Sequence, residues 1–208
     1  KEKSFTMKRE VINNVSAYVD YDGSTAIVTV TRFDNDTGTK VQEFAKEFSD
    51  KGVKKVILDL RNNGGGYVSA AEDMLSLWID NDVYLVQKSK HYGDSESTTA
   101  AGRAVLKDMK TIVLVNGSTA SASEIVCGAL QDMDRAVLMG QRSYGKGLVQ
   151  SVVPLGYNAY LKLTTAKYYI PSGRCVQRIN YSHDSSLKEE NVPDSLINEF
   201  TTANGRKV

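Results

Sequence analysis

The chain has 208 residues, of which 41% are hydrophobic and 25% charged, a composition typical of a globular protein that can bury a core. Its net charge of +1 gives no electrostatic case for binding nucleic acid, and no stretch approaches the roughly 18 apolar residues of a membrane span. His91, His183, Cys127 and Cys175 follow no metal-ligand spacing. We therefore expect neither a metal nor another cofactor, and we expect the two cysteines to be buried free thiols.

Runs of β-branched and apolar residues predict strands, and apolar residues spaced three and four apart predict helices between them. Residues 54–60 are apolar without alternation, which is typical of a strand covered on both faces. Residues 88–104 are polar and are expected to form a mobile loop. Strands alternating with helices indicate an α/β fold with a largely parallel sheet and flanking helices, followed by a half-exposed C-terminal antiparallel hairpin. The expected strands are 26–33, 54–60, 82–87, 111–115, 135–140, 150–154 and 157–169, and the expected helices begin near 39, 68 and 121.

Composition divides the chain into three parts. Residues 1–22 are polar and are expected to be a lead-in segment, residues 23–179 form the core, and residues 180–208 form a polar segment that is partly ordered. A short helix is expected around 195–200. The sequence begins with Lys1, and we expect no signal peptide within it.

The stretch 116–132 reads as a tight turn that leads from a strand into a helix. It contains Ser118, Ser121 and Ser123 near the start of the helix. A serine there can be held exposed, and the free N–H groups of the first helical turn can bind an oxyanion, which suits nucleophilic attack. The alternative is structural, because Ser121 and Glu124 have the spacing of a capping box, and such caps are common.

The glycine run 64–66 and Lys146 also each have a structural and a functional interpretation. Gly64, Gly65 and Gly66 follow an expected strand, and they form either a flexible turn or an exposed amide aimed at a ligand. Lys146 lies between two glycines in a turn, where its amine could reach a cleft. A lysine acts as a base only when it is neutral, and an ordinary pKa of about 10.4 must be lowered by burial before that happens near pH 7. An exposed turn lysine is the commoner outcome.

Five segments favour the functional alternative for Ser121, the glycines and Lys146, because together they resemble one protein family. They lie at 58–66, 115–125, 128–132, 140–150 and 163–173, in the family's order, and they cover most of residues 24–175. The chain resembles the protease core of the carboxyl-terminal processing peptidases, also called tail-specific proteases. The resemblance implies a crotonase/Clp-protease-like core for the expected α/β fold.

The resemblance also implies a catalytic dyad. The family uses a serine and a lysine 25 residues later, and Ser121 and Lys146 have that separation, whereas Ser118 and Ser123 do not. A glutamine four residues after the lysine orients it in the family, and Gln150 has that position. Ser121 would form an acyl-enzyme, with Lys146 as the general base.

The implied oxyanion hole uses the backbone N–H groups of Ala122 and of a glycine in the run, for which we favour Gly65. The family usually has proline where this chain has Gly64, so this loop departs from the pattern. Asp132 matches a further family position, and we expect it to support the structure.

The resemblance predicts a serine endopeptidase that cuts proteins near unstructured C-termini, in the periplasm or cell envelope of a bacterium. Members of the family carry a PDZ domain before the core, and this chain has no room for one, so we expect an excised core. One alternative is a non-catalytic binding domain of the same fold, although Ser121, Lys146 and Gln150 are all present. Another is a serine–lysine amidase or esterase for small molecules. The oligomeric state is left open, a homo-oligomer included.

Overall fold

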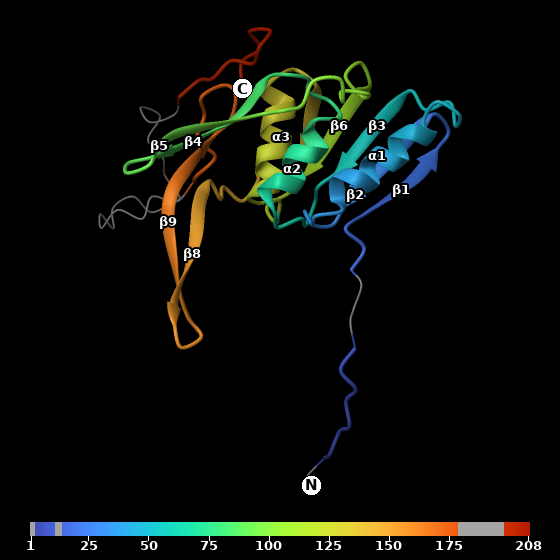
Figure 1. Cartoon of the computed structure of the whole chain (residues 1–208). Helices are drawn as coiled ribbons and strands as arrows, with labels where there is room; N and C mark the ends of the chain where they lie inside the picture. The colour runs from blue at the N-terminus through green and yellow to red at the C-terminus, as the bar shows by residue number, and fades with distance from the viewer. Residues whose placement is uncertain (1–2, 11–13, 179–197) are drawn as a thin grey trace.

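The computed structural model describes residues 3–10, 14–178 and 198–208. These residues form nine strands in two sheets, together with three helices (Figure 1). No helix among them is both long enough and apolar enough to cross a membrane. The strands are β1 Ala17–Asp22, β2 Thr25–Val30, β3 Lys55–Asp59, β4 Val83–Ser89, β5 Gly93–Thr98, β6 Lys110–Val115, β7 Ala136–Gly140, β8 Leu148–Gly156 and β9 Ala159–Tyr169, and the helices are α1 Thr37–Glu47, α2 Val68–Leu75 and α3 Ala122–Asp132.

The main sheet contains five strands in the order β1-β2-β3-β6-β7. β2, β3, β6 and β7 are parallel, which confirms the expected largely parallel sheet, and β1 is antiparallel to β2. β1 lies inside the segment that was expected to be a lead-in. Its sequence, Ala-Tyr-Val-Asp-Tyr-Asp, carries a weak strand signal, and pairing with β2 along its whole length holds it in place.

The core lies on one face of the main sheet. Val56 and Leu58 of β3 are buried with the apolar sides of all three helices, and α2 contacts both α1 and α3. The residue between them, Ile57, is only half-buried, as are its register partners Ile27 and Ile112. The prediction that β3 is covered on both faces is therefore wrong for the residues described. The run does not alternate because the half-buried face of β3 also carries an apolar residue, Ile57.

A separate antiparallel sheet, here called the hairpin sheet, has the order β5-β4-β9-β8. The expected loop at 88–104 contains β5, so that prediction is wrong. The polar sequence of β5 carries no strand signal, and β5 is a strand because its backbone pairs with that of β4. β8 and β9 form the expected antiparallel hairpin, which projects away from the helices and the main sheet (Figure 1). The hairpin is more exposed than expected, because Leu161 and Leu163 are 45% and 49% accessible.

The end of α3 anchors two later segments. Asp132 is buried, its carboxylate accepts the Ser172 N–H at 3.0 Å, and its carbonyl accepts the Ala203 N–H at 2.7 Å. Asp132 therefore has the supporting role expected of it. The helix expected around 195–200 lies largely outside the described residues, and residues 198–200 are not helical.

Candidate active site

Ser121 has an unusual backbone conformation at the junction between β6 and α3. Its φ is +59° and its ψ is −119°, a region that residues with a side chain rarely adopt. The surrounding turn fixes this geometry, because the carbonyl of Asn63 accepts the Ala120 N–H and the Ser123 hydroxyl, both at 3.0 Å. Strained residues of this kind occur at functional sites, including nucleophiles held at a turn from strand to helix.

The other two serines have different surroundings. Ser123 is fully buried, and its hydroxyl is used in the bond to Asn63. Ser118 lies in the exposed part of the turn, where its N–H donates to Asn116 Oδ1 at 3.1 Å. The capping interaction is also present, since Glu124 Oε2 accepts the Ser121 N–H at 2.9 Å. Ser121 is therefore the strained residue of the three and a helix cap at once.

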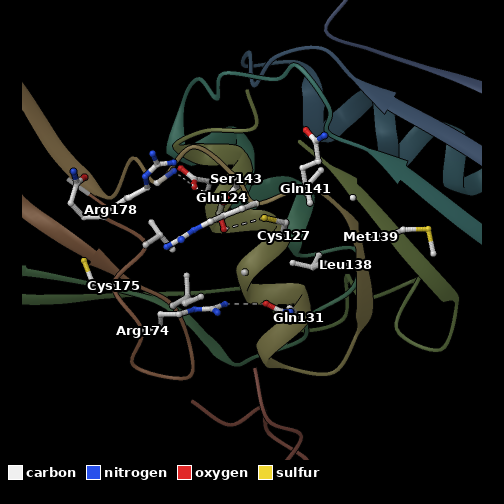
Figure 2. Close-up of a pocket in the computed structure, with 18 residues that line it drawn as sticks. Glu124, Cys127, Gln131, Leu138, Met139, Gln141, Ser143, Arg174, Cys175 and Arg178 are labelled. Atoms are coloured by element: carbon white, nitrogen blue, oxygen red, sulfur yellow. Dashed lines mark hydrogen bonds between the residues drawn. The ribbon is translucent and has the colours of Figure 1, made fainter. Parts of the chain in front are cut away.

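Glu124 connects Ser121 to the loop that carries Lys146. Its side chain is buried, and besides the Ser121 N–H it accepts the Ser143 hydroxyl at 2.7 Å and the N–H groups of Gly145 and Lys146 at 2.6 and 2.7 Å. Figure 2 shows Ser143 joined to Glu124 at the start of α3. The sequence indicated only a local cap here, and the link to residues 143–146 was missed.

Replacing Glu124 by glutamine is expected to destabilise the fold by about 2–3 kcal/mol, because an amide has one acceptor oxygen and turns an NH₂ group toward buried N–H donors. We also expect peptide cleavage to slow at least about tenfold, since the Lys146 loop loses its anchor. Urea unfolding and a cleavage assay measure the two effects. Glu43→Gln on the exposed side of α1 is the matched control. Equal stability of Glu124→Gln and the control would contradict this role.

The Lys146 loop is also held from its other side. Gln177 Oε1 accepts the Gly147 N–H at 2.8 Å, and the carbonyl of Gly145 accepts the Arg178 N–H at 3.0 Å. A Cβ on Gly145 would lie 2.3 Å from Cβ of Arg178, and its φ is +87°, so only glycine fits there. Gln177 belongs to a segment that the sequence gave no reason to connect with the site.

A cavity of about 420 Å³ brings two of the predicted site residues together, Lys146 and Gln150, whereas Ser121, Ala122 and Gly65 are not among its lining residues. Gly64 and Ala120, the neighbour of Ser121, also line it. The Lys146 side chain is exposed, and among the described residues Ser121 and Lys146 share no side-chain hydrogen bond. Catalytic hydrogen bonds in unliganded enzymes are often long and tighten when substrate binds.

The residues expected to form the oxyanion hole lie beside Ser121. The Ala122 N–H, in the first turn of α3, has no acceptor among the described residues. Gly65 packs directly on the turn, since an added Cβ would lie 2.7 Å from the Ala120 carbonyl oxygen and 2.8 Å from Ser121 Cβ. The Gly65 N–H donates to Asn63 Oδ1 at 2.9 Å, so an oxyanion would have to replace that acceptor. The choice of glycine donor stays a prediction.

Asp59 and Arg61 clamp the start of the turn that leads to the glycines. Arg61 donates to the Asp59 carboxylate through Nε and through Nη2, the latter at 2.6 Å, and its backbone N–H adds a bond of 3.0 Å. Burial acts to raise the pKa of Asp59, but the hydrogen bonds and charge of Arg61 outweigh it and hold that pKa below its ordinary value.

Asp59→Asn is expected to change how stability depends on pH. Because the folded pKa is depressed, the ionised carboxylate stabilises the fold above its unfolded pKa of about 3.9, and this contribution disappears as the pH falls through the folded value. The difference in unfolding free energy between parent and variant should be constant near neutral pH and shrink in acid. Urea unfolding at stepped pH measures it, and a difference that stays constant into acid would contradict the prediction.

A second cavity, of about 370 Å³, is lined by Glu124 and by later residues of α3 (Figure 2). Cys127 and Cys175 both line it, and both are free thiols, as expected, although only Cys127 is buried. Burial raises the pKa of the Cys127 thiol to about 12, so it is protonated and unreactive near neutral pH.

Comparison with known proteins identifies the family. Residues 24–186 match peptidase family S41. The chain is 36% identical over 170 residues to a chloroplastic C-terminal processing peptidase of Tetradesmus obliquus, covering 81% of this chain and 36% of the relative. It is 36% identical over 194 residues to a carboxyl-terminal-processing protease of Synechocystis, covering 90% of this chain and 44% of the relative.

A solved structure agrees with these relatives. The photosystem II D1 C-terminal processing protease superposes with a TM-score of 0.72 at 29% identity, over 80% of this chain and 46% of that one. The chain thus spans less than half the length of each of these three proteins. The match over residues 24–186 and the similar relatives show that the chain belongs to peptidase family S41.

Proposed function

We propose that this chain is the core of a serine endopeptidase in which Ser121 is the nucleophile and Lys146 the general base. The observation that carries the proposal is the link through Glu124: a strained serine at a helix N-terminus is hydrogen-bonded, through one buried carboxylate, to the loop that bears the lysine. Gln150, which lines the same cavity, orients the lysine amine. The fold around this site corresponds to a crotonase/Clp-protease-like core.

The first step is attack on the scissile carbonyl. The Lys146 side chain is exposed in this structure, so the proposal requires bound substrate to cover it. The neutral form of its amine then takes the proton from Ser121 Oγ as that oxygen bonds to the carbonyl carbon. The resulting oxyanion is stabilised by the N–H of Ala122, which is strengthened by the positive end of α3, and by the N–H of Gly65. Collapse of this intermediate breaks the peptide bond, and the ammonium of Lys146 gives its proton to the leaving amine.

The second step releases the acyl group. Lys146, neutral again, takes a proton from a water molecule that attacks the acyl carbon on Ser121. The ester bond then breaks, and Lys146 returns the proton to Ser121 Oγ. The serine hydroxyl and the lysine amine are both regenerated at the end of the cycle, so the reaction consumes no cofactor.

The substrates we infer are proteins with unstructured C-termini. The names of the relatives support this, since they describe C-terminal processing, and the chain covers only part of those proteins. We place a substrate-capturing PDZ domain in the part that it does not cover, and the whole protein in the periplasm or envelope of a bacterium. Both inferences rest on family resemblance.

Cleavage of matched carriers tests this proposal. One folded carrier has an unstructured tail at its C-terminus, a second has the same tail at its N-terminus, and a small ester serves as a third substrate. We expect this chain, but not Ser121→Ala, to cut the C-terminal tail. Cleavage of the ester alone would indicate a small-molecule amidase or esterase. Binding of the tail without cleavage would indicate a binding domain.

A further inference from the structure

Strand β8 forms one edge of the hairpin sheet and begins two residues after Lys146. Within the described part of the chain it pairs only with β9. In an antiparallel pair, every second residue directs its N–H and C=O groups away from the partner strand. The outer edge of β8 therefore presents backbone donors and acceptors that no described strand uses.

One end of this edge opens into the cavity of the proposed active site. Leu148 and Gln150, which alternate along β8, line that cavity together with Lys146 and Ala120. The strand then runs out of the cavity and along the projecting hairpin (Figure 1). A chain paired with the edge would thus be led toward Lys146 and toward Ala120, the residue before Ser121.

The part of β8 outside the cavity is apolar and uncovered. Val152, Val153 and Leu155 are 59%, 43% and 61% exposed, and β8 contains no charged residue. Exposed edge strands usually carry charges, prolines or bulges that prevent pairing with other chains. β8 has Pro154 and a bulge directly after it, and its register with β9 also shifts between Val149 and Gln150, where the extra residue lies on β9. Residues 149–153 of β8 itself contain no proline and no extra residue, so their outer backbone groups are available for pairing.

We propose that residues 149–153 of β8 bind an extended segment of the protein substrate by strand addition and that Val152 and Val153 favour apolar side chains in it. This rests on the proposed function. Backbone pairing supplies affinity for any extended chain, and alternate side chains supply selectivity. Val152 lies two residues after Gln150, so with a rise of about 3.4 Å per residue it contacts a substrate position roughly 7 Å beyond the one opposite Gln150.

The edge could also pair with a second copy of the chain. The continuity of β8 with the cavity favours a substrate, because the same strand lines the proposed catalytic cavity at one end and exposes apolar side chains at the other. Unfolded substrate segments expose both backbone groups and apolar side chains, which are the two chemistries that this edge offers.

Hydrogen exchange in Ser121→Ala tests the pairing without turnover. With saturating unstructured casein peptide, we expect alternate amides within 149–153 to exchange at least about tenfold more slowly, as hydrogen-bonded amides do. Peptide binding that leaves the β8 amides unprotected, or protects the other edge strands β1, β5 or β7 instead, would overturn the proposal. Protection that grows with protein concentration in the absence of peptide would show that a second copy binds there, and would overturn it too.

A charge substitution tests the selectivity. Val152→Lys is expected to raise KM for an apolar peptide by roughly fivefold or more with kcat little changed, because an apolar contact is lost and a charge is added. The matched control is Val137→Lys on β7, an edge strand of the main sheet, where Val137 is 53% exposed. Equal KM values for the two variants would contradict the inference. Parent cleavage that is absent in Ser121→Ala tests the proposed function separately, so either claim can fail alone.

Discussion

Replacing Ser121 by alanine is expected to slow cleavage of unfolded casein by at least about a thousandfold, since the acyl-enzyme cannot form. Lys146→Ala should have a comparable effect. Lys146→Arg should not restore activity, because arginine keeps the positive charge but cannot give up a proton to act as a base. Liquid chromatography of the released peptides measures the rates.

The matched control is Ser118→Ala. Ser118 lines the cavity that Lys146 lines, but it lies in the exposed part of the turn, away from the helix junction. We expect this variant to keep cleavage near the parent rate. Two results would remove Ser121 from the mechanism: undiminished cleavage by Ser121→Ala, or a loss in Ser118→Ala as large as that in Ser121→Ala.

Gly65→Ala is expected to lower both the cleavage rate and the stability of the fold. The added methyl would meet Ala120 O at 2.7 Å and Ser121 Cβ at 2.8 Å, and Gly65 has a φ of +99°, which strains any residue with a side chain. We expect the glycine turn to move away from Ser121. Cleavage should then fall by about a hundredfold or more, as when an oxyanion-hole donor is lost, and stability should fall by about 1–3 kcal/mol.

Gly64 provides the control. A Cβ at Gly64 meets nothing within 4 Å, so Gly64→Ala should be nearly neutral. Gly64→Pro also removes the N–H of residue 64 and introduces the residue usual in the family. Activity retained in Gly64→Pro and lost in Gly65→Ala would assign the oxyanion donor to Gly65. A folded but inactive Gly64→Pro would assign it to Gly64 instead.

Local sequence patterns predicted the elements that carry their own signal. β3, β6 and the start of α3 combine apolar runs with glycine or serine boundaries, and each lies where it was expected. β1 and β5 are polar, and they are strands because β2 and β4 pair with them. The one-sided burial of β3 was also hidden, because an apolar run does not reveal which neighbours cover each face.

Some residues of the candidate site could be predicted from the sequence, and others could not. Ser121, Lys146 and Gln150 came from spacing within a recognised family, and the structure places Lys146 and Gln150 on one cavity that Ser121 itself does not line. Glu124 was visible as a capping partner, but its bonds to Gly145 and Lys146 span more than 20 residues and appear only in the folded chain. Gln177 gave no signal, since its role depends on β9 returning beside the Lys146 loop.

Trapping the acyl-enzyme shows whether Ser121 is the nucleophile. The chain is mixed with casein peptide, quenched in acid within the first turnover, digested and analysed by mass spectrometry. We expect a peptide acyl group on Ser121 that is absent in Ser121→Ala and strongly reduced in Lys146→Ala. Continued cleavage with no acyl group on the chain, or an acyl group on Ser118, would contradict this expectation.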